Sequence, residues 1–292
     1  MHVFKGIVSC VSMRKKIVWC VVLAAVLAAC DRKKAVPETG WTNDSITDFL
    51  TESPDSFFST ATAEEELSDR ADELFDDFIF DFARLRKVQS ERVSFPLLSV
   101  VRGDTVWIMR EQWTHEPLFM DQDYYTVFYN NEEQMELEKR TDLNRVDVEQ
   151  ILLADRVVRT CCFERLDGEW MLTRETERDF LPSEPLDAFM DFYQQFVTDS
   201  DFQQKRVADP LRYITTDLED DFGTVEGTLD NEQWNAFKPH LPSGVITNIR
   251  YGQTYDDPRN MIMVKAGISN GLMDIFDFGK KNGKWMLVSY EN

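Results

Sequence analysis

Histidine, cysteine and glycine are all scarce in this chain, which has three, five and twelve of them among 292 residues. His115 and His240 are the only histidines after the second residue, and neither has a second histidine or a cysteine at metal-binding spacing. The few glycines form no loop of the kind that holds phosphates or dinucleotides. We therefore expect no metal, no cofactor and no catalytic residue that a motif would reveal.

Positive charge is also in short supply. The chain has 32 Lys and Arg against 53 Asp and Glu, which gives a formal net charge of -21. Such a surface repels nucleic-acid phosphates and gains nothing from anionic lipid headgroups. Nucleic-acid partners are therefore not expected, and any attachment to a membrane must have a source other than charge.

The longest apolar run, residues 17–29, is too short to span a bilayer. At about 1.5 Å per residue it covers roughly 20 Å of the ~30 Å hydrocarbon core. It follows the basic residues 14–16 and ends in Leu27-Ala28-Ala29-Cys30, the arrangement of a bacterial lipoprotein signal peptide. The pattern predicts cleavage before Cys30 and a durable anchor of several acyl chains on it.

This signal fixes an expected location in the cell envelope. We expect residues 1–29 to be the signal peptide and residues 30–63 to be a polar tether, which places the rest of the chain on the periplasmic side. Whether the anchor lies in the inner or the outer membrane stays open, as does the choice of Met1 or Met13 as the start.

Few cysteines remain after the signal peptide is removed. Cys10 and Cys20 leave with it and Cys30 is the lipid site, so only Cys161 and Cys162 are left. Neighbouring strand residues point to opposite faces of a sheet, which strains a disulfide between them. We expect both to be small apolar strand residues, and the fold to depend on an ordinary hydrophobic core.

An internal repeat divides the rest of the chain. Residues 73–97 and 187–211 align without gaps and are identical at nine of twenty-five positions. The shared phenylalanines are spaced three and four apart, which is one apolar stripe on a helix. A shared Gln-x-x-Arg-Val-x-x-Pro-Leu sequence follows the stripe, and its proline is expected to end the helix.

The repeat returns near the end of each half. Phe163 to Leu172 matches Phe278 to Leu287, and both segments contain a dipeptide typical of a type I′ hairpin turn, Asp167-Gly168 and Asn282-Gly283. Between helix and hairpin, Glu111-Gln112-Trp113 recurs as Glu232-Gln233-Trp234. Each half therefore predicts a long amphipathic helix, short middle elements and a meander of antiparallel strands, which is an α+β plan.

We expect two globular domains, residues 64–181 and 182–292, each closing its own core. The phenylalanine stripe, the sequence that follows it and the closing Asp/Asn-Gly-x-Trp-Met-Leu hairpin resemble the cystatin-like, nuclear-transport-factor-two-like (NTF2-like) cone. More narrowly, the plan is similar to a domain-of-unknown-function family of lipoproteins from Gram-negative gut bacteria with two such domains. The resemblance implies two repeated cones, each a curved antiparallel sheet around a long N-terminal helix that often leaves a pocket. It brings no catalytic residue.

Four residues are candidates for a pocket. Asp274 and Asp277 lie on opposite faces of the apolar strand 272–278, so one of them faces the domain interior, where burial would raise its pKa and suit it to acid or base chemistry. An outward or hydrogen-bonded carboxylate is the plainer alternative. Trp113 and Trp234 are expected either to line pockets or to fill the core.

Three functions stay open at this point. The leading one is a lipid-anchored, non-enzymatic protein that binds a small ligand or an envelope protein in its cones. The second is an isomerase- or hydratase-type enzyme that uses an interior carboxylate. The third is a structural module that self-assembles through an exposed apolar sheet face.

Overall fold

The computed structural model describes residues 74–217 and 223–292, so the predicted signal peptide, Cys30 and the tether lie outside the described residues. The described residues belong to one compact unit. Within the described ranges, no helix has the length and apolar character needed to cross a membrane.

The fold is mixed α+β, and the two halves have the same succession of described elements except for η2, which has no counterpart in the second half. The first half contains α1 (Phe75–Arg84), α2 (Arg86–Glu91), β1 (Val93–Val101), β2 (Asp104–Ile108), η1 (Arg110–Gln112), β3 (Tyr124–Tyr129), η2 (Glu132–Lys139), β4 (Arg145–Leu152), β5 (Val157–Leu166) and β6 (Glu169–Asp179). The second half contains α3 (Pro185–Thr198), α4 (Ser200–Gln204), β7 (Val207–Thr216), β8 (Thr224–Leu229), α5 (Asn231–Phe237), β9 (Val245–Arg250), β10 (Asn260–Gly267), β11 (Met273–Lys281) and β12 (Lys284–Glu291).

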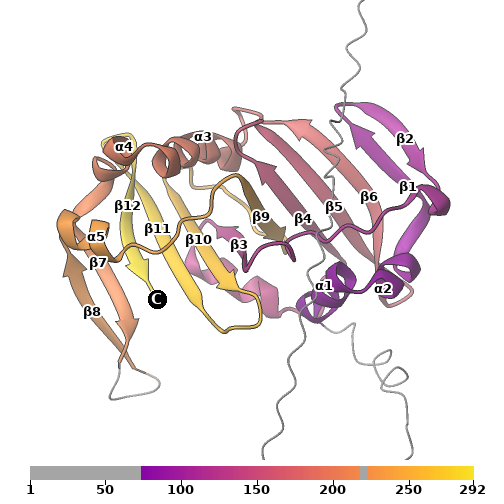
Figure 1. The fold of residues 1–292 in the computed structure, drawn as a ribbon, viewed down its shortest axis with the longest axis horizontal. Coiled ribbons are helices and arrows are strands. Elements are labelled where there is room, and N and C mark those ends of the chain that lie inside the picture. Colours follow the sequence, from indigo (N-terminus) through magenta and orange to yellow (C-terminus); the bar gives the residue numbers. More distant parts are fainter. Residues whose placement is uncertain (1–73, 218–222) are drawn as a thin grey trace, which may run out of the picture. The chain divides into compact units, whose positions relative to one another are not determined.

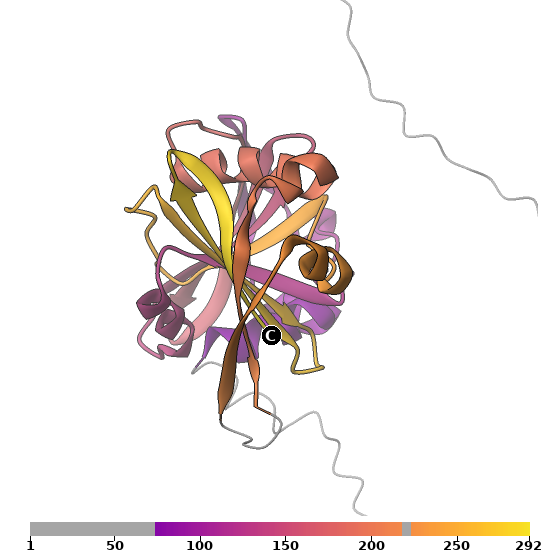
Figure 2. The ribbon, with the colours of Figure 1, turned by 90° about the vertical axis from the view of Figure 1, so that its left-hand side faces the viewer.

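The strands form two six-stranded sheets with matching orders. One sheet runs β2-β1-β6-β5-β4-β9 and the other β8-β7-β12-β11-β10-β3 (Figure 1). Figures 1 and 2 place the helices of the two halves, α1 with α2 and α3 with α4, at opposite sides of the body. The sequence repeat is therefore visible as a pseudo-twofold arrangement of the described elements.

The two halves exchange a strand, which differs from the expectation that each half closes its own core. β9 pairs with β4 of the first half, in the register Gln150↔Thr247, and β3 pairs with β10 of the second half, in the register Lys265↔Thr126. Each exchanged strand is the edge strand of its sheet, in the middle of the body where the two sheets meet (Figure 1), and most of its residues are buried. Alternation along a strand specifies which face is buried but not which strand lies alongside it.

The hydrophobic cores are shared for the same reason. The core around α1 includes Ile249 and Val264 of the second half, and the core around α3 includes Phe128 and Val158 of the first. Because each core contains side chains from both halves, separating the halves would expose apolar surface of both cores to water. Such exposure is unfavourable by about 25 cal/mol per Å².

The predicted phenylalanine stripe packs into the core in both halves, with Phe192 partly exposed, although the helices are shorter than expected. In α1, whose described residues span Phe75–Arg84, the rings of Phe75, Phe78 and Phe82 all contact Phe163 of β5. The long N-terminal helix predicted for the first half is not seen in the described residues. Each stripe packs its aromatic edges against one strand phenylalanine, which fixes how the helix crosses the sheet.

The repeated prolines do not end the helices as predicted. Pro96 and Pro210 lie inside β1 and β7, each after a cis peptide bond. The parallel ladders of these two strands are interrupted there, between Val93 and Leu98 in β1. A strand accepts proline where no ladder hydrogen bond is required, which explains why it recurs at this point.

The turn predictions are confirmed. Asp167-Gly168 and Asn282-Gly283 have positive φ at both residues, as a type I′ turn requires, and they join β5 to β6 and β11 to β12. The repeated Glu-Gln-Trp sequence also has a structural role, because Gln112 and Gln233 each accept a hydrogen bond from the backbone N–H three residues earlier, at 2.9 Å. The repeat therefore preserves two turns and two helix starts.

Candidate functional site

The first half contains a polar cavity on the face of its sheet that packs against α1. We call it the Glu175 cavity; its volume is about 230 Å³. Two neighbouring rows of side chains cross β1, β6, β5 and β4 to form its floor, because residues paired in register share a face. The residues of the rows that line it are Ser99, Glu175 and Cys161, then Val101, Glu177, Arg159 and Gln150.

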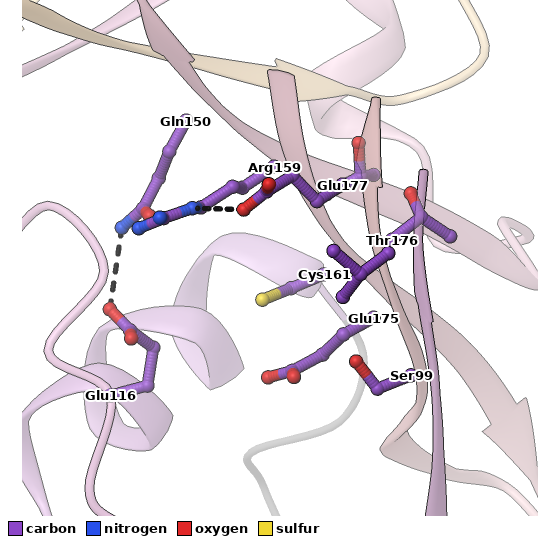
Figure 3. Close-up of a pocket in the computed structure, with 10 residues that line it drawn as sticks. Ser99, Glu116, Gln150, Arg159, Cys161, Glu175, Thr176 and Glu177 are labelled. Atoms are coloured by element: carbon purple, nitrogen blue, oxygen red, sulfur yellow. Dashed lines mark hydrogen bonds and ion pairs between the residues drawn. The ribbon is translucent and has the colours of Figure 1, made fainter. Parts of the chain in front are cut away.

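Two carboxyl groups face this cavity from different elements. Glu175 comes from β6 and Glu116 from the loop that follows η1, and Figure 3 shows both side chains directed toward the space beside the Cys161 sulfur. Burial, and then the charge of Glu116, raise the pKa of Glu175 from 4.5 to about 7, although Arg159 partly opposes the shift. Glu175 therefore exchanges its proton near neutral pH.

Gln89 of α2 holds the Glu116 loop in place. Its Nε2 donates to the backbone oxygens of Phe82 (3.0 Å) and Glu116 (2.8 Å), and its Oε1 accepts from the Glu116 backbone N–H (2.7 Å). On the other side, Gln150 Nε2 donates to Glu116 Oε1 at 3.3 Å (Figure 3). The repeated glutamine of the sequence thus positions a cavity carboxylate.

Among the described residues that line the cavity, Arg159 is the one cation, and it is already engaged. Arg159 Nε donates to Glu177 Oε2 at 2.9 Å. The charges of Arg159 and Glu177 cancel each other, so the carboxyl groups of Glu116 and Glu175 make the cavity acidic. Cys161 adds no charge, because burial and then the charges of Glu175 and Glu116 raise the pKa of its thiol well above the usual range. A thiol held protonated is a poor nucleophile.

The second half has a cavity at the corresponding place, with different chemistry. In the second sheet, Tyr290 lies opposite Tyr213 on one side and Phe276 on the other. Glu175 has the same place in the first sheet, between Ser99 and Cys161. We call this the Tyr290 cavity; its volume is about 310 Å³. Its lining residues are Tyr213, Leu229, Trp234, Phe237, Tyr290 and Asn292.

The structure separates the four predicted pocket residues. Trp234 is buried in α5 and lines the Tyr290 cavity. Asp274 lies beside it: it accepts a hydrogen bond from Tyr290 Oη at 2.7 Å and pairs with Lys265 Nζ at 2.8 Å. Asp274 is therefore a hydrogen-bonded carboxylate whose charge is balanced by Lys265. A hydrogen-bonded carboxylate is the plainer of the two alternatives that the sequence left open.

Asp277 and Trp113 line other cavities. Asp277 faces the opposite side of β11 and opens on a surface hollow of about 460 Å³ beside Asn131 and Glu132, where burial raises its pKa. Trp113 is half-buried beside a separate hollow of about 210 Å³, and its Nε1 donates to Gln89 Oε1 at 3.2 Å. Neither residue reaches the Glu175 cavity.

Sequence reasoning missed Glu175 because a β-bulge changes the side of the strand on which it lies. In β6, Leu172 pairs with Phe163 but Arg174 pairs with Cys162, so one extra residue is inserted between them. Simple alternation from the buried Leu172 predicts that Glu175 points outward. β12 has the same irregularity between Leu287 and Ser289.

One further sequence pattern has a structural explanation. Gly267 to Gly271 has the Gly-x-Ser-x-Gly spacing of a nucleophile elbow, which needs a strand followed by a helix. Here it forms the connection between β10 and β11, two antiparallel strands, with positive φ at Ser269 and Gly271. The segment is a hairpin turn. In addition, no group of three or more potential metal ligands occurs in the described part of the chain.

Comparison with known proteins identifies the family and the fold. Residues 54–292 match a domain of unknown function, DUF4348. The crystal structure of an NTF2-like protein from Bacteroides fragilis NCTC 9343 is similar, with a TM-score of 0.72 and 42% identity over 76% of this chain and 96% of that one. No curated protein matches the chain. The NTF2-like fold is thus shown, and with it the expectation of a fold of the ligand-binding type.

Proposed function

We propose that this chain, which belongs to the DUF4348 family, binds a small cationic ligand in the Glu175 cavity. The observation that carries the proposal is the pair Glu116 and Glu175, which face one cavity. Arg159, the one cation among the described residues that line it, is already paired with Glu177. An ammonium group placed between the two carboxylates supplies the missing charge. Two further polar atoms, Ser99 Oγ and Gln150 Oε1, are available to orient a small molecule.

The proposed setting is the cell envelope. The lipoprotein signal before Cys30 and the polar tether support a chain that is anchored through its lipid, with a body made of two related NTF2-like cones on the periplasmic side. A small amine that reaches the periplasm would enter such a cavity directly from solution. Membrane contact through the lipid and a small ligand are therefore the partners we propose.

Calorimetric titration of residues 30–292, which include the whole compact unit, tests this proposal. Methylammonium, ethylammonium and 1,3-diaminopropane are compared with acetate and propionate. We expect the amines to bind and the carboxylates not to bind. Because a bound cation lowers the pKa of Glu175, which is about half protonated at pH 7, amine binding at that pH releases up to about half a proton per ligand, and the measured heat depends on the ionisation enthalpy of the buffer.

Three variants locate the binding site. Glu175→Gln and Glu116→Gln each weaken amine binding about tenfold or more, since a hydrogen bond to a charged group contributes about 1.5–3 kcal/mol. Glu226→Gln removes the same charge from β8 of the second half and leaves the affinity unchanged. Equal affinities for all three variants, or tighter binding of carboxylates than of amines, would refute the proposal.

Acid–base catalysis is a second candidate, favoured by one observation. A pKa of about 7 gives Glu175 both protonation states at neutral pH, which suits a general acid or base. An enzyme would convert an amine that binds, and proton NMR of the mixture over hours would show a product. Glu175→Gln would then abolish turnover, whereas an unchanged spectrum with every bound amine leaves binding as the function.

A further inference from the structure

A surface hollow beside α2 in the first half is basic, although the chain is strongly acidic. It is the hollow of about 210 Å³ next to Trp113, and we call it the Arg86 hollow. No Asp or Glu is among the described residues that line it, whereas the whole chain has 53 acidic residues against 32 Lys and Arg. Its main lining residues come from α2, from β1 and from η1 with the loop that follows: Arg86, Gln89, Phe95, Arg110, Trp113 and His115.

Neither arginine of the hollow has a carboxylate partner within the part of the chain that the structure describes. Most other described arginines are paired, as Arg145 is with Asp147 at 2.9 Å. Both Arg86 and Arg110 are exposed, so an anion from solution can reach them. Two guanidinium charges are therefore available at one small hollow.

The guanidinium group of Arg110 is held in place by its neighbours. One of its N–H groups donates to the backbone oxygen of Ser90, and its central carbon lies 4.7 Å from the centre of the Phe95 ring. The Phe95 ring in turn meets Trp113 edge-on at 6.1 Å. A guanidinium group has five N–H donors, so this arrangement positions the group and leaves most of its donors for a ligand.

The fold does not require these two arginines, because the second half lacks them. The offsets that relate the two halves place Ser200 at the position of Arg86 and Asn231 at the position of Arg110. In the second half, Asn231 Nδ2 donates to Asp209 Oδ2 at 3.0 Å, so a neutral amide and a carboxylate occupy the corresponding place. The arginines of the first half therefore need a reason other than the shared scaffold, and an anionic ligand supplies one.

A phosphate monoester has the chemistry that this lining recognises. Its three terminal oxygens carry about −1.5 to −2 charges at pH 7, which two guanidinium groups from different elements balance. A carboxylate has one charge and two oxygens, which matches only one of the two arginines. The hollow is smaller than the ~300–1,000 Å³ of pockets for drug-sized ligands, so the ester is that of a short alcohol. The negative charge elsewhere on the surface is screened beyond about 8 Å at physiological salt.

We propose that the Arg86 hollow is a second binding site, which holds a small phosphate monoester. Arg86 and Arg110 donate hydrogen bonds to the terminal oxygens of the phosphate. This site does not depend on amine binding, because its lining shares no residue with the Glu175 cavity.

The probe is methyl phosphate, and dimethyl phosphate is its control. The diester has one charge and two terminal oxygens, like the phosphate of a phospholipid headgroup, so the comparison separates a free monoester from a lipid. Residues 30–292 are titrated at about pH 7.5 in a phosphate-free buffer and binding is followed by phosphorus NMR. We expect methyl phosphate to bind with a Kd of about 1 mM or below, and dimethyl phosphate to bind at least about tenfold more weakly.

Variants of the two arginines locate the site. Arg86→Gln and Arg110→Gln should each weaken methyl phosphate binding about tenfold or more, because each removes a charged hydrogen-bond donor. Arg86→Lys keeps the charge and should retain more affinity than Arg86→Gln. Arg206→Gln is the matched control: Arg206 has the same charge and lies 4.8 Å over the Phe202 ring, but it is outside the hollow, so the affinity should not change.

Three results would overturn the proposal. They are an absence of methyl phosphate binding at about 10 mM, tighter binding of dimethyl phosphate than of methyl phosphate, and an unchanged affinity in either glutamine variant of the two lining arginines. Because both arginines are exposed, we expect these variants to keep the melting temperature of the parent chain, as circular dichroism would show.

The same measurements separate this site from the proposed function. Arg86→Gln should leave the affinity for methylammonium unchanged, and Glu175→Gln should leave the affinity for methyl phosphate unchanged. Failure of methyl phosphate to bind leaves the amine result intact, and failure of the amines leaves the phosphate result intact.

Discussion

Ionisation of Glu175 should destabilise the folded chain above neutral pH, and Glu175→Gln should remove that effect. Folding raises the pKa of Glu175 from 4.5 to about 7, so the folded state binds the proton more tightly than the unfolded state. The free energy of unfolding therefore falls as the pH rises from about 4.5 to 7 and stays low above it.

The size of the effect follows from the shift. At 1.36 kcal/mol for each pKa unit, the cost of ionising Glu175 in the folded chain is about 3 kcal/mol at most. The side chain is half-buried, so solvent screening reduces this to about 2 kcal/mol. Glutamine keeps the shape and a hydrogen-bonding side chain without the charge, so the variant should gain this amount at pH 8 and very little at pH 4.5.

Urea unfolding followed by circular dichroism at pH 4.5, 6, 7 and 8 measures the difference. Glu226→Gln is the control: Arg212 lowers the pKa of the exposed Glu226, so any contribution of that carboxylate to stability has the opposite sign, is lost only in acid, and does not change between pH 6 and 8. The reasoning is refuted if the difference between Glu175→Gln and the parent chain is the same at every pH, or if the variant is less stable at pH 8.

Three further predictions follow from the fold and the site. Phe163→Ala and Phe278→Ala should each lower the free energy of unfolding by about 3–5 kcal/mol, within one cooperative denaturant transition because the cores are shared; two separate transitions would count against sharing. Gln89→Ala should cost about 1–3 kcal/mol and weaken amine binding by releasing the Glu116 loop, while an unchanged affinity would show that the loop needs no such support. Cys161 should react with iodoacetamide at pH 8 more slowly than free glutathione, as measured by mass spectrometry, and equal rates would contradict its raised pKa.

Local structure in this chain could be predicted well from the sequence because its signals are short-range. The apolar strand expected over 272–278 occurs as Met273–Lys281, and both type I′ turns are in place. Alternating burial and Asn-Gly or Asp-Gly dipeptides act over a few residues, so no tertiary information is needed.

Strand partners and the candidate site could not be predicted in this way. β3 and β9 carry the same apolar pattern whether they pair within their own half or with the other half, so the exchange leaves no trace in periodicity. The single extra residue of β6 moves Glu175 from one face to the other, and its position depends on the pairing with β5. Asp274 and Asp277 attracted attention as carboxylates in an apolar strand, but a lysine and an open hollow explain them.

The exchange of β3 and β9 also has a consequence for the order in which the chain is completed. When β4 emerges from the ribosome, its outer edge has no neighbour until Thr247 has been made, about 100 residues after Gln150, which takes roughly 5–20 s at ordinary elongation rates. During that interval the first half has an unfinished sheet whose free edge can pair with other chains. The pairings that join the two halves, β4 with β9 and β3 with β10, must therefore wait until the second half has been synthesised.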